Sequence, residues 1–431
     1  MLLLQSGRSA GGDGVLTDLL ACFLDVPDRR APRWVEHPLA AVLALCAGAV
    51  VAGMCSFTAV AGWIADVPAD LLDQLYLRCG AGPTGPPSKA TVWRVVTGVD
   101  AGPVDAAIGA WLLARAAQDQ ATGQDSDTSE PDAVSLTALA VDGKTVRGAK
   151  DHEGNRVHLL AAMTHDRGLV AAYREHSASE RYTALPEHLP RLAGRASVCP
   201  SSARCRRQRT TPAHRHTSKY VGTHNAAPTP LSSASSATSD TQRGTAVWLH
   251  QRGADFVFCV KENQPGLFTA LDALPWKDVP IGHAATDRGH GRITRRTIQV
   301  LPAPDDLPFP HVNQVFLVER YVTDLHGRSL SDVAVLGVTS LTAHRADPPQ
   351  LAQLVRGHWK IESLHWIRDV TYREDDSTAH TRSGPQVMAA LRNLAIGAHR
   401  LTGRTDIAEA TCWASRAIDR PFHILGLTSR S

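Results

Sequence analysis

Apolar residues recur at spacings of three and four along the first quarter of the chain. The clearest stripes are Leu16, Leu19, Leu20 and Phe23, and then Ile108, Trp111 and Leu112. This periodicity is typical of amphipathic helices, so we expect residues 15–117 to be helical. Residues 38–65 carry no charge and are long enough to cross a membrane, but their Ala, Gly, Ser and Thr content favours a buried helical hairpin.

Pro87-Ser88 stands just ahead of an apolar run at residues 91–96, a pattern that predicts a capped helix. Such a helix could enter a DNA groove and present Arg94 to it. A packing helix with a solvated Arg94 fits the same pattern at least as well.

Three short apolar runs follow at residues 136–141, 157–163 and 169–173. The turn-like His165-Asp166-Arg167-Gly168 separates the last two, so we expect three consecutive strands in a meander. Because Asp142 directly follows the first run, we expect its carboxylate at the C-terminal edge of that strand, with access to solvent.

A later block predicts further strands at residues 293–301, 314–322 and 333–339. The block separates a strand at 256–260 from a predicted helix, which is typical of a β-rich insertion. His290, Arg292, Arg295 and Arg296 could bind DNA phosphates there, with solvated loop charge as the alternative.

The helix that follows this block carries a candidate catalytic carboxylate, Glu362. Its broad face at helical spacing comprises Leu351, Leu354, Val355, His358, Ile361, Glu362 and His365. This spacing predicts that Glu362 points towards the sheet beside the apolar anchors. The alternative is a surface carboxylate, since helical Glu is usually solvated.

Composition sets bounds without identifying a function. A length of 431 residues with 43% apolar content favours two or three domains with sizeable cores. The net charge of +3 is only mildly basic and does not by itself establish nucleic-acid binding. Eight cysteines without disulfide-framework spacing and the lack of a secretory leader predict a cytoplasmic protein without a membrane span.

Short motifs run in a fixed order over nearly the whole chain. They are Val26-Pro27-Asp28 with His37-Pro38-Leu39, Cys55-Ser56-Phe57-Thr58-Ala59-Val60-Ala61, Pro87-Ser88-Lys89-Ala90-Thr91-Val92-Trp93-Arg94, Val141-Asp142-Gly143-Lys144-Thr145-Val146-Arg147-Gly148, Gly253-Ala254-Asp255-Phe256-Val257-Phe258 with Lys261-Glu262-Asn263-Gln264, Gly289-His290-Gly291-Arg292, His358-Trp359-Lys360-Ile361-Glu362 with Leu364-His365-Trp366, Asp369-Val370-Thr371-Tyr372-Arg373-Glu374-Asp375 and Leu391-Arg392-Asn393-Leu394-Ala395. In this order they resemble the insertion-sequence transposases of the H-repeat-associated type, which carry an Asp-Asp-Glu triad on an RNase H-like fold.

The resemblance implies an α+β fold with an RNase H-like mixed sheet core, an N-terminal all-helical domain and a β-rich insertion. The implied division is 1–117 for the helical domain, 118–133 for an acidic linker, 134–261 and 346–431 for the two parts of the core, and 262–345 for the insertion.

The resemblance also implies the chemistry. Asp142 would be the first metal-binding carboxylate and Glu362 the third, holding Mg²⁺ or Mn²⁺ for phosphodiester cleavage and strand transfer. Lys144, Arg147 and His358 would contact DNA, although ordinary surface charge explains Lys144 and Arg147 equally well. The implied partners are double-stranded DNA, both element ends and target, and further copies of the chain on that DNA in the nucleoid.

In the family the second Asp ends a buried strand just before a Thr-Gln pair, and this chain lacks it there. Residues 188–239 contain no Asp or Glu. Counting back from Thr241 by the family's spacing places the second Asp at Ala237, and the acidic residue nearest to that position is Asp240. Residues 195–239 show no strand-length apolar run, so we expect them to be disordered and to supply no central strand. A frame slip or inserted sequence would explain this, as would a family-specific insertion. Loss of a metal ligand predicts impaired cleavage.

Other functions fit parts of the sequence. A noncatalytic transposase remnant would keep DNA binding, and an unrelated metal-dependent hydrolase could use Arg373-Glu374-Asp375-Asp376, otherwise a solvated loop or helper site. Cys199, Cys205, His214 and His216 indicate a zinc site only weakly, because their separations match no usual paired-ligand pattern.

Overall fold

The N-terminal part of the chain is helical, as its periodicity predicts. The computed structural model describes residues 18–31, 35–82, 84–123, 138–150, 156–175, 197–201, 234–262, 264–377 and 379–428. The first helices are α1 (Leu19–Leu24), α2 (Leu39–Val51), α3 (Phe57–Ala65), α4 (Ala69–Arg78), α5 (Lys89–Gly98) and α6 (Ala101–Gly123). Helix α6 therefore extends past residue 117, where the linker was expected to follow.

Helices α2 and α3 form the predicted hairpin, of which α2 is buried throughout and α3 only at Val60, Trp63 and Ile64. All 13 residues of α2 are buried, and among the described residues no helix is both long and apolar enough to cross a membrane. Helix α5 begins at the predicted cap, because the Ser88 hydroxyl accepts a hydrogen bond from the Thr91 amide at 3.2 Å.

One mixed sheet runs through the molecule in the strand order β3-β2-β1-β4-β5-β9-β8-β7-β6. The first five strands are β1 (Ala138–Lys150), β2 (Arg156–Thr164), β3 (Val170–Glu175), β4 (Ser197–Ser201) and β5 (Asp255–Val260). The β1-β2-β3 part is the predicted antiparallel meander, and β4 pairs in parallel with both β1 and β5. This is the RNase H-like arrangement that the resemblance implies.

The β-rich block extends this sheet. Its strands are β6 (His283–Gly289), β7 (Arg292–Pro302), β8 (Gln314–Asp324) and β9 (Ser329–Thr339), and β9 pairs with β5. The three strands predicted in this block are confirmed, whereas β6 was not foreseen. His290 and Gly291 both adopt positive φ, 51° and 72°, and form the tight turn between β6 and β7.

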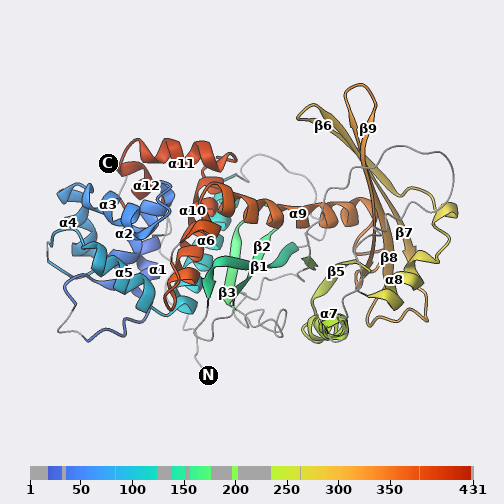
Figure 1. The fold of residues 1–431 in the computed structure, drawn as a ribbon, viewed down its shortest axis with the longest axis horizontal. Coiled ribbons are helices and arrows are strands. Elements are labelled where there is room, and N and C mark those ends of the chain that lie inside the picture. Colours follow the sequence, from blue (N-terminus) through green and yellow to red (C-terminus); the bar gives the residue numbers. More distant parts are fainter. Residues whose placement is uncertain are drawn as a thin grey trace, which may run out of the picture.

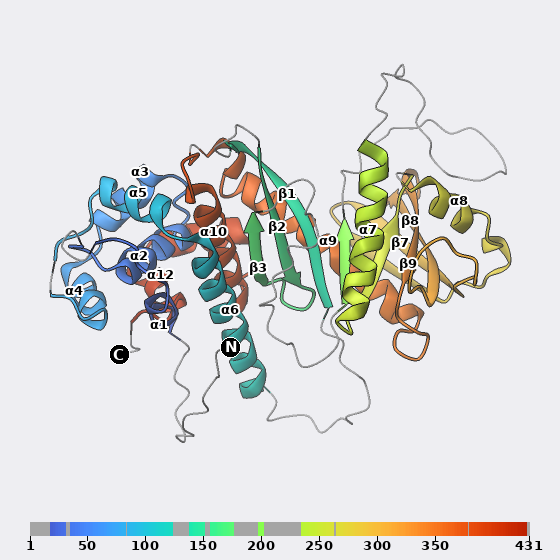
Figure 2. The same cartoon turned by 90° about the horizontal axis from the view of Figure 1, so that it is seen from below.

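Helices cover the sheet on opposite faces, with α9 behind the strands and α7 in front of them in Figure 2. Alternate residues of β1 separate the two layers: Val141 belongs to the same hydrophobic core as Ala246 of α7 (Ala234–Gln251), whereas Ala140 belongs to the same core as Ile361 of α9 (Pro348–Val370). Helix α8 (Pro265–Asp272) packs on the α7 side of the extended sheet. The chain ends with α10 (Gly384–Leu401), α11 (Ile407–Ser415) and α12 (Asp419–Ile424).

Helix α9 connects the two halves of the molecule (Figure 1). Its 23 residues begin at a capping box formed by Asp347 and Gln350 and extend about 34 Å. Leu351 and Leu354 pack with Phe316 of the extended sheet, and Ile361 belongs to the same core as α2, α6 and α10. The N-terminal helices and the C-terminal helices thus share one hydrophobic core, which the division of the sequence into segments did not predict.

Candidate active site

Asp142 lies within β1 rather than at its end, which corrects the expectation from the sequence. The strand continues to Lys150, and Asp142 pairs with Ala161 of β2. On its other side β4 ends at Ser201, the partner of Asp142, so the parallel pairing stops at this position. The carboxylate is 12% exposed and faces α9, where the Nδ1 atom of His365 lies 3.6 Å away.

The contact between His365 and Asp142 is not an ion pair at neutral pH. Burial lowers the pKa of His365 to about 3, and Arg368 and Lys144 act in the same direction. The imidazole is therefore neutral. Its contact shows which side of α9 lies against Asp142, but it does not neutralise the Asp142 carboxylate.

Glu362 lies on α9 three residues before His365, and its side chain is exposed. Side chains at this spacing are neighbours on a helix surface, which brings Glu362 to the same side of α9 as the residue that contacts Asp142. Partial desolvation raises the pKa of Glu362, while Lys261 and Arg320 oppose that shift. The exposure of Glu362 fits the alternative of a surface carboxylate, while its direction towards the sheet and its mutual approach with Asp142 stay predictions.

The segment expected to supply no strand does supply one. Residues Ser197–Ser201 form β4 between β1 and β5, and α7 begins at Ala234. Parallel backbone pairing with two neighbours stabilises a strand even where its own side chains are polar or small. Residues 202–233, which include Cys205, His214 and His216, lie outside the described residues.

No acid occupies the end of β4. Ser201 is its last residue, and Ala237, where counting back from Thr241 places the second Asp, lies inside α7. Asp240 also lies in α7, whose buried residues Ala246 and Leu249 pack on the sheet face opposite α9. The side chain of Asp240 is outside the described residues, so its role as a carboxylate in the site stays a prediction.

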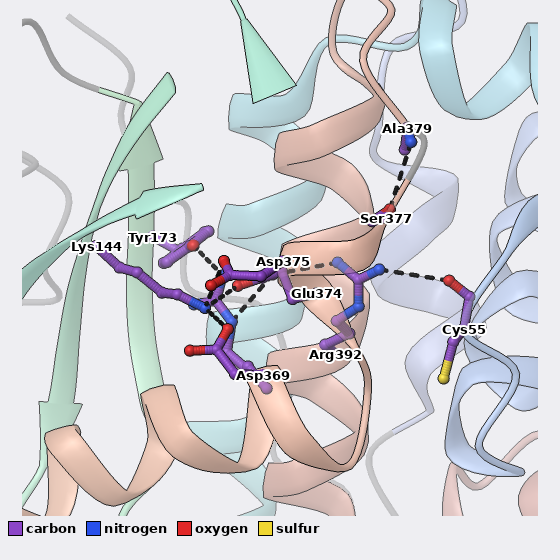
Figure 3. Close-up of polar contacts among 10 residues, drawn as sticks. Cys55, Lys144, Tyr173, Asp369, Glu374, Asp375, Ser377, Ala379 and Arg392 are labelled. Atoms are coloured by element: carbon purple, nitrogen blue, oxygen red, sulfur yellow. Dashed lines mark hydrogen bonds and ion pairs between the residues drawn. The ribbon is translucent and has the colours of Figure 1, made fainter. Parts of the chain in front are cut away.

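Beside Asp142 lies a buried cluster of charges centred on Glu374 (Figure 3). Glu374 is fully buried. One of its oxygens accepts from Arg368 Nη2 at 2.6 Å and from Arg392 Nη1 at 3.1 Å, and the other accepts from Lys144 Nζ at 2.9 Å. Lys144 also bonds Asp369 and lies 3.8 Å from Asp375. The cluster therefore ties β1, α9 and α10 together.

The charges of this cluster stabilise one another. Burial opposes ionisation of Glu374, but Arg368, Arg392 and Lys144 outweigh it and hold the pKa of that carboxyl far below its usual range. The guanidinium of Arg368 also donates to Tyr173 and lies 4.5 Å from the centre of its ring. Arg392 reaches the carbonyl of Cys55 at 3.5 Å. The reading of residues 373–376 as a solvated loop is wrong for Glu374, and its oxygens are occupied by cations rather than free for a metal.

The candidates for DNA contact divide by exposure. Arg94, His290 and Arg292 are exposed. Lys144 is only 9% exposed and is ion-paired with three carboxylates, and His358 is 5% exposed, so the burial of both side chains contradicts their predicted contact with DNA. Arg147 lies in β1, but its side chain is outside the described residues.

A divalent metal is the cofactor that the resemblance implies, and hard carboxylate oxygens are the ligands it requires. Asp142 and Glu362 are suitable in type. However, no group of three His, Cys, Asp or Glu side chains in the described part of the chain could hold a metal ion. The donor set for a complete metal site is therefore not present among these residues.

The sequence did not reveal the buried cluster. Lys144 and Glu374 are 230 positions apart, and Arg368 and Arg392 read as ordinary charges on helices. The available signal was the position of both arginines on otherwise apolar helix faces, since a charge there is buried only when it is paired.

Two family matches agree with this fold and site. The family described as DDE_Tnp_1-associated matches residues 20–112, and the family described as Transposase DDE domain matches residues 198–397. Together the matches cover about two thirds of the chain. The chain belongs to the DDE transposases of insertion sequences, enzymes that transfer phosphoryl groups on DNA.

Individual relatives show the same likeness over most of their length. YbfL of Escherichia coli K12 is 24% identical over 396 residues, which are 86% of this chain and 87% of YbfL. The H repeat-associated protein YhhI of the same strain is 24% identical over 398 residues, with the same shares of both chains. Among solved structures, the chain is similar to a piggyBac transposase in a synaptic complex with hairpin DNA, solved by cryo-electron microscopy. The two chains are 9% identical, and the match covers 93% of this chain and 80% of the piggyBac chain. The TM-score of 0.32 is too low to support an argument.

Proposed function

We propose that this chain binds the double-stranded DNA ends of its insertion sequence but cleaves them poorly, because one carboxylate of its metal site is missing. The observation that carries the proposal is the register of the central parallel strands. Ser201 ends β4 opposite Asp142, and because the family's second Asp also ends a buried strand, we assign its position to Ser201 rather than to Ala237. A hydroxyl in place of a carboxylate removes a negatively charged oxygen ligand that Mg²⁺ or Mn²⁺ would require.

Asp142 and Glu362 are the two residues that would hold the metal. In members with a complete set, the ions activate the attacking oxygen and stabilise the leaving one during phosphodiester cleavage and strand transfer. The described residues of this chain supply an incomplete set, so we expect cleavage to fall by several orders of magnitude while the fold and DNA binding persist.

The test is a cleavage assay on duplexes that carry the terminal repeats flanking the gene, with Mg²⁺ or Mn²⁺ added. We expect the unmodified chain to shift these duplexes in a gel but not to cut them, and Ser201→Asp to recover metal-dependent cleavage. Adding Asp142→Asn to Ser201→Asp should abolish the recovered activity, which provides the matched control.

Three results separate the alternatives. Cleavage by the unmodified chain that Asp240→Asn abolishes would make Asp240 the working second carboxylate and overturn the proposed impairment. Binding without cleavage in every variant, Ser201→Asp included, would favour a noncatalytic DNA-binding remnant. Activity that survives Asp142→Asn would favour an unrelated hydrolase.

DNA contact by Arg94, His290 and Arg292 belongs to the same proposal, as do assembly of several copies on DNA and association with the nucleoid. Arg94 lies on α5 and the other two lie at the β6–β7 turn. Light scattering of the chain with and without duplex measures the assembly, and a chain that stays monomeric on DNA would refute it.

A further inference from the structure

Arg320 stands on β8 directly opposite another arginine. In the register of the sheet it faces Arg296 of β7, and side chains in directly opposite positions lie on the same face, so the two positive charges repel each other. Arg296 is neutralised by an ion pair with Asp287. Arg320 is half-buried, its Nε atom is buried without a hydrogen-bond partner, and no carboxylate in the described part of the chain forms an ion pair with it. A partly buried cation in this position costs stability unless an anion binds to it.

Two observations place the Arg320 guanidinium beside Glu362. Its central carbon lies 5.7 Å from the centre of the Trp359 ring on α9, and Trp359 precedes Glu362 by three residues, a spacing that makes the two side chains neighbours on the helix surface. Burial raises the pKa of the Glu362 carboxyl, whereas the positive charges of Lys261 and Arg320 lower it. Arg320 therefore acts on Glu362 through space without forming an ion pair with it.

A phosphodiester is the anion that fits this place. The guanidinium is planar and presents paired N–H donors that match two phosphate oxygens. A phosphate that approaches Glu362 is repelled by the carboxylate, and a cation next to both groups offsets that repulsion. Arg356, on the same helix as Glu362, already has Asp287 as its partner at 3.0 Å, whereas Arg320 has no acidic partner among the described residues.

We propose that Arg320 binds the phosphate at the junction between the element and the flanking DNA and holds it beside Glu362. This is the phosphate that a cleaving member of the family would attack. The inference rests on the proposed function, because the ligand is element-end DNA, but it requires neither a metal nor cleavage. The contact persists in a chain that lacks one carboxylate of its metal site.

The test measures affinity, without added metal, for a duplex that spans the junction and for two duplexes in which one phosphate is replaced by a neutral methylphosphonate. The replaced phosphate is the junction phosphate in the first and a phosphate well inside the element in the second. We expect Arg320→Ala to weaken binding of the unsubstituted duplex about 10- to 100-fold. On the junction methylphosphonate the same variant should lose less than about 2-fold, because the partner charge is already gone, while its full loss should remain on the inner methylphosphonate. Arg320→Lys should keep part of the affinity, because an ammonium retains the charge but not the paired donors.

Arg328→Ala provides the matched control, because Arg328 is an exposed arginine in the turn between β8 and β9. Its effect should be the same on all three duplexes. An Arg320→Ala loss of equal size on all three duplexes, or no loss on any of them, would overturn the phosphate contact and leave the proposed function standing. Failure of the unmodified chain to bind the unsubstituted duplex would overturn both.

Thermal unfolding without DNA distinguishes a ligand-binding arginine from a structural one. Arg320→Ala removes a charge that repels Arg296, so its melting temperature should not fall below that of the unmodified chain. A variant that no longer folds would identify Arg320 as a structural cation and overturn the inference.

Discussion

Replacing Glu374 by Gln tests whether the buried cluster holds the fold together. The substitution keeps the shape of the side chain but removes the negative charge that three cations share. Glu374 accepts four hydrogen bonds from charged donors, two from Arg368 and one each from Arg392 and Lys144. Arg368 is fully buried and Arg392 is 2% exposed, so neither can recover its lost partner from water.

The expected loss follows from those contacts. Hydrogen bonds to charged groups contribute about 1.5–3 kcal/mol each, but the Gln amide oxygen still accepts some of them. Removing one partner of a buried ion pair costs about 3–5 kcal/mol, because the remaining charge stays buried without compensation. We therefore expect Glu374→Gln to lower the free energy of unfolding by about 3–5 kcal/mol.

Urea unfolding followed by tryptophan fluorescence measures this loss. Asp376→Asn provides the matched control two residues away, since Asp376 is 72% exposed and its pair with Arg373 is exposed as well; exposed pairs contribute about 0–1 kcal/mol. A loss below about 1 kcal/mol in Glu374→Gln would refute the role assigned to the cluster. A double-mutant cycle with Lys144→Met should show a coupling of about 0.5–3 kcal/mol, because the two groups touch.

Acid should reveal the same cluster. The folded-state pKa of Glu374 lies below its ordinary value of 4.5, so the stability that its charge contributes is present above pH 4.5 and is lost as the pH falls below it. Unfolding curves of Glu374→Gln should lack that part of the acid dependence, and curves that fall in parallel with those of the unmodified chain would contradict the assignment.

Further predictions concern a close packing contact, the half-buried His165 and the basic turn. Gly337→Ala should destabilise the sheet by about 1–3 kcal/mol, because a Cβ there would lie 2.1 Å from the Phe316 ring. Gly244→Ala, in the open middle of α7, should be neutral or stabilising. Equal melting temperatures for the two variants would contradict this prediction. Burial lowers the pKa of His165 from 6.5 to about 4. The neutral imidazole should therefore contribute at most about 3 kcal/mol of stability above pH 6.5, and this contribution should be lost as the pH falls towards 4. His165→Gln should flatten the dependence of the free energy of unfolding on pH between those two values. Arg292→Ala should weaken DNA binding evenly across sequences and reduce the slope of affinity against salt by about one, while an unchanged slope would exclude a phosphate contact.

Periodicity predicted the elements whose own residues bury a face. The strands at 293–301, 314–322 and 333–339, the capped helix after Ser88 and the hairpin of α2 and α3 all have patterns that determine their structure locally. Strand β6 was missed because its residues alternate between partial and full exposure and carry no apolar run. Strand β4 was missed because its backbone pairing with β1 and β5, rather than its side chains, defines it.

The site was only partly predictable for a related reason. Asp142 stands next to an apolar run, and that local pattern was enough to single it out, although the strand continues past it to Lys150. Lys144 gave no such signal, because the carboxylates that pair with it, Asp369 and Glu374, are more than 200 positions away. A charged residue in a single sequence reads as surface until the partner that compensates it is known.

The shared core of α2 and α10 has a consequence for synthesis of the chain. All 13 residues of α2 are buried, and α10, which belongs to the same core, is completed 350 residues after α2 ends. At translation rates of about 5–20 residues per second, α2 is complete roughly 20–70 s before α10 is available. A helix this apolar remains without its final cover for that interval, so we expect the newly made chain to need chaperones to keep it from aggregating. Its yield in cells should therefore respond to chaperone supply more strongly than the stability of the finished protein would suggest.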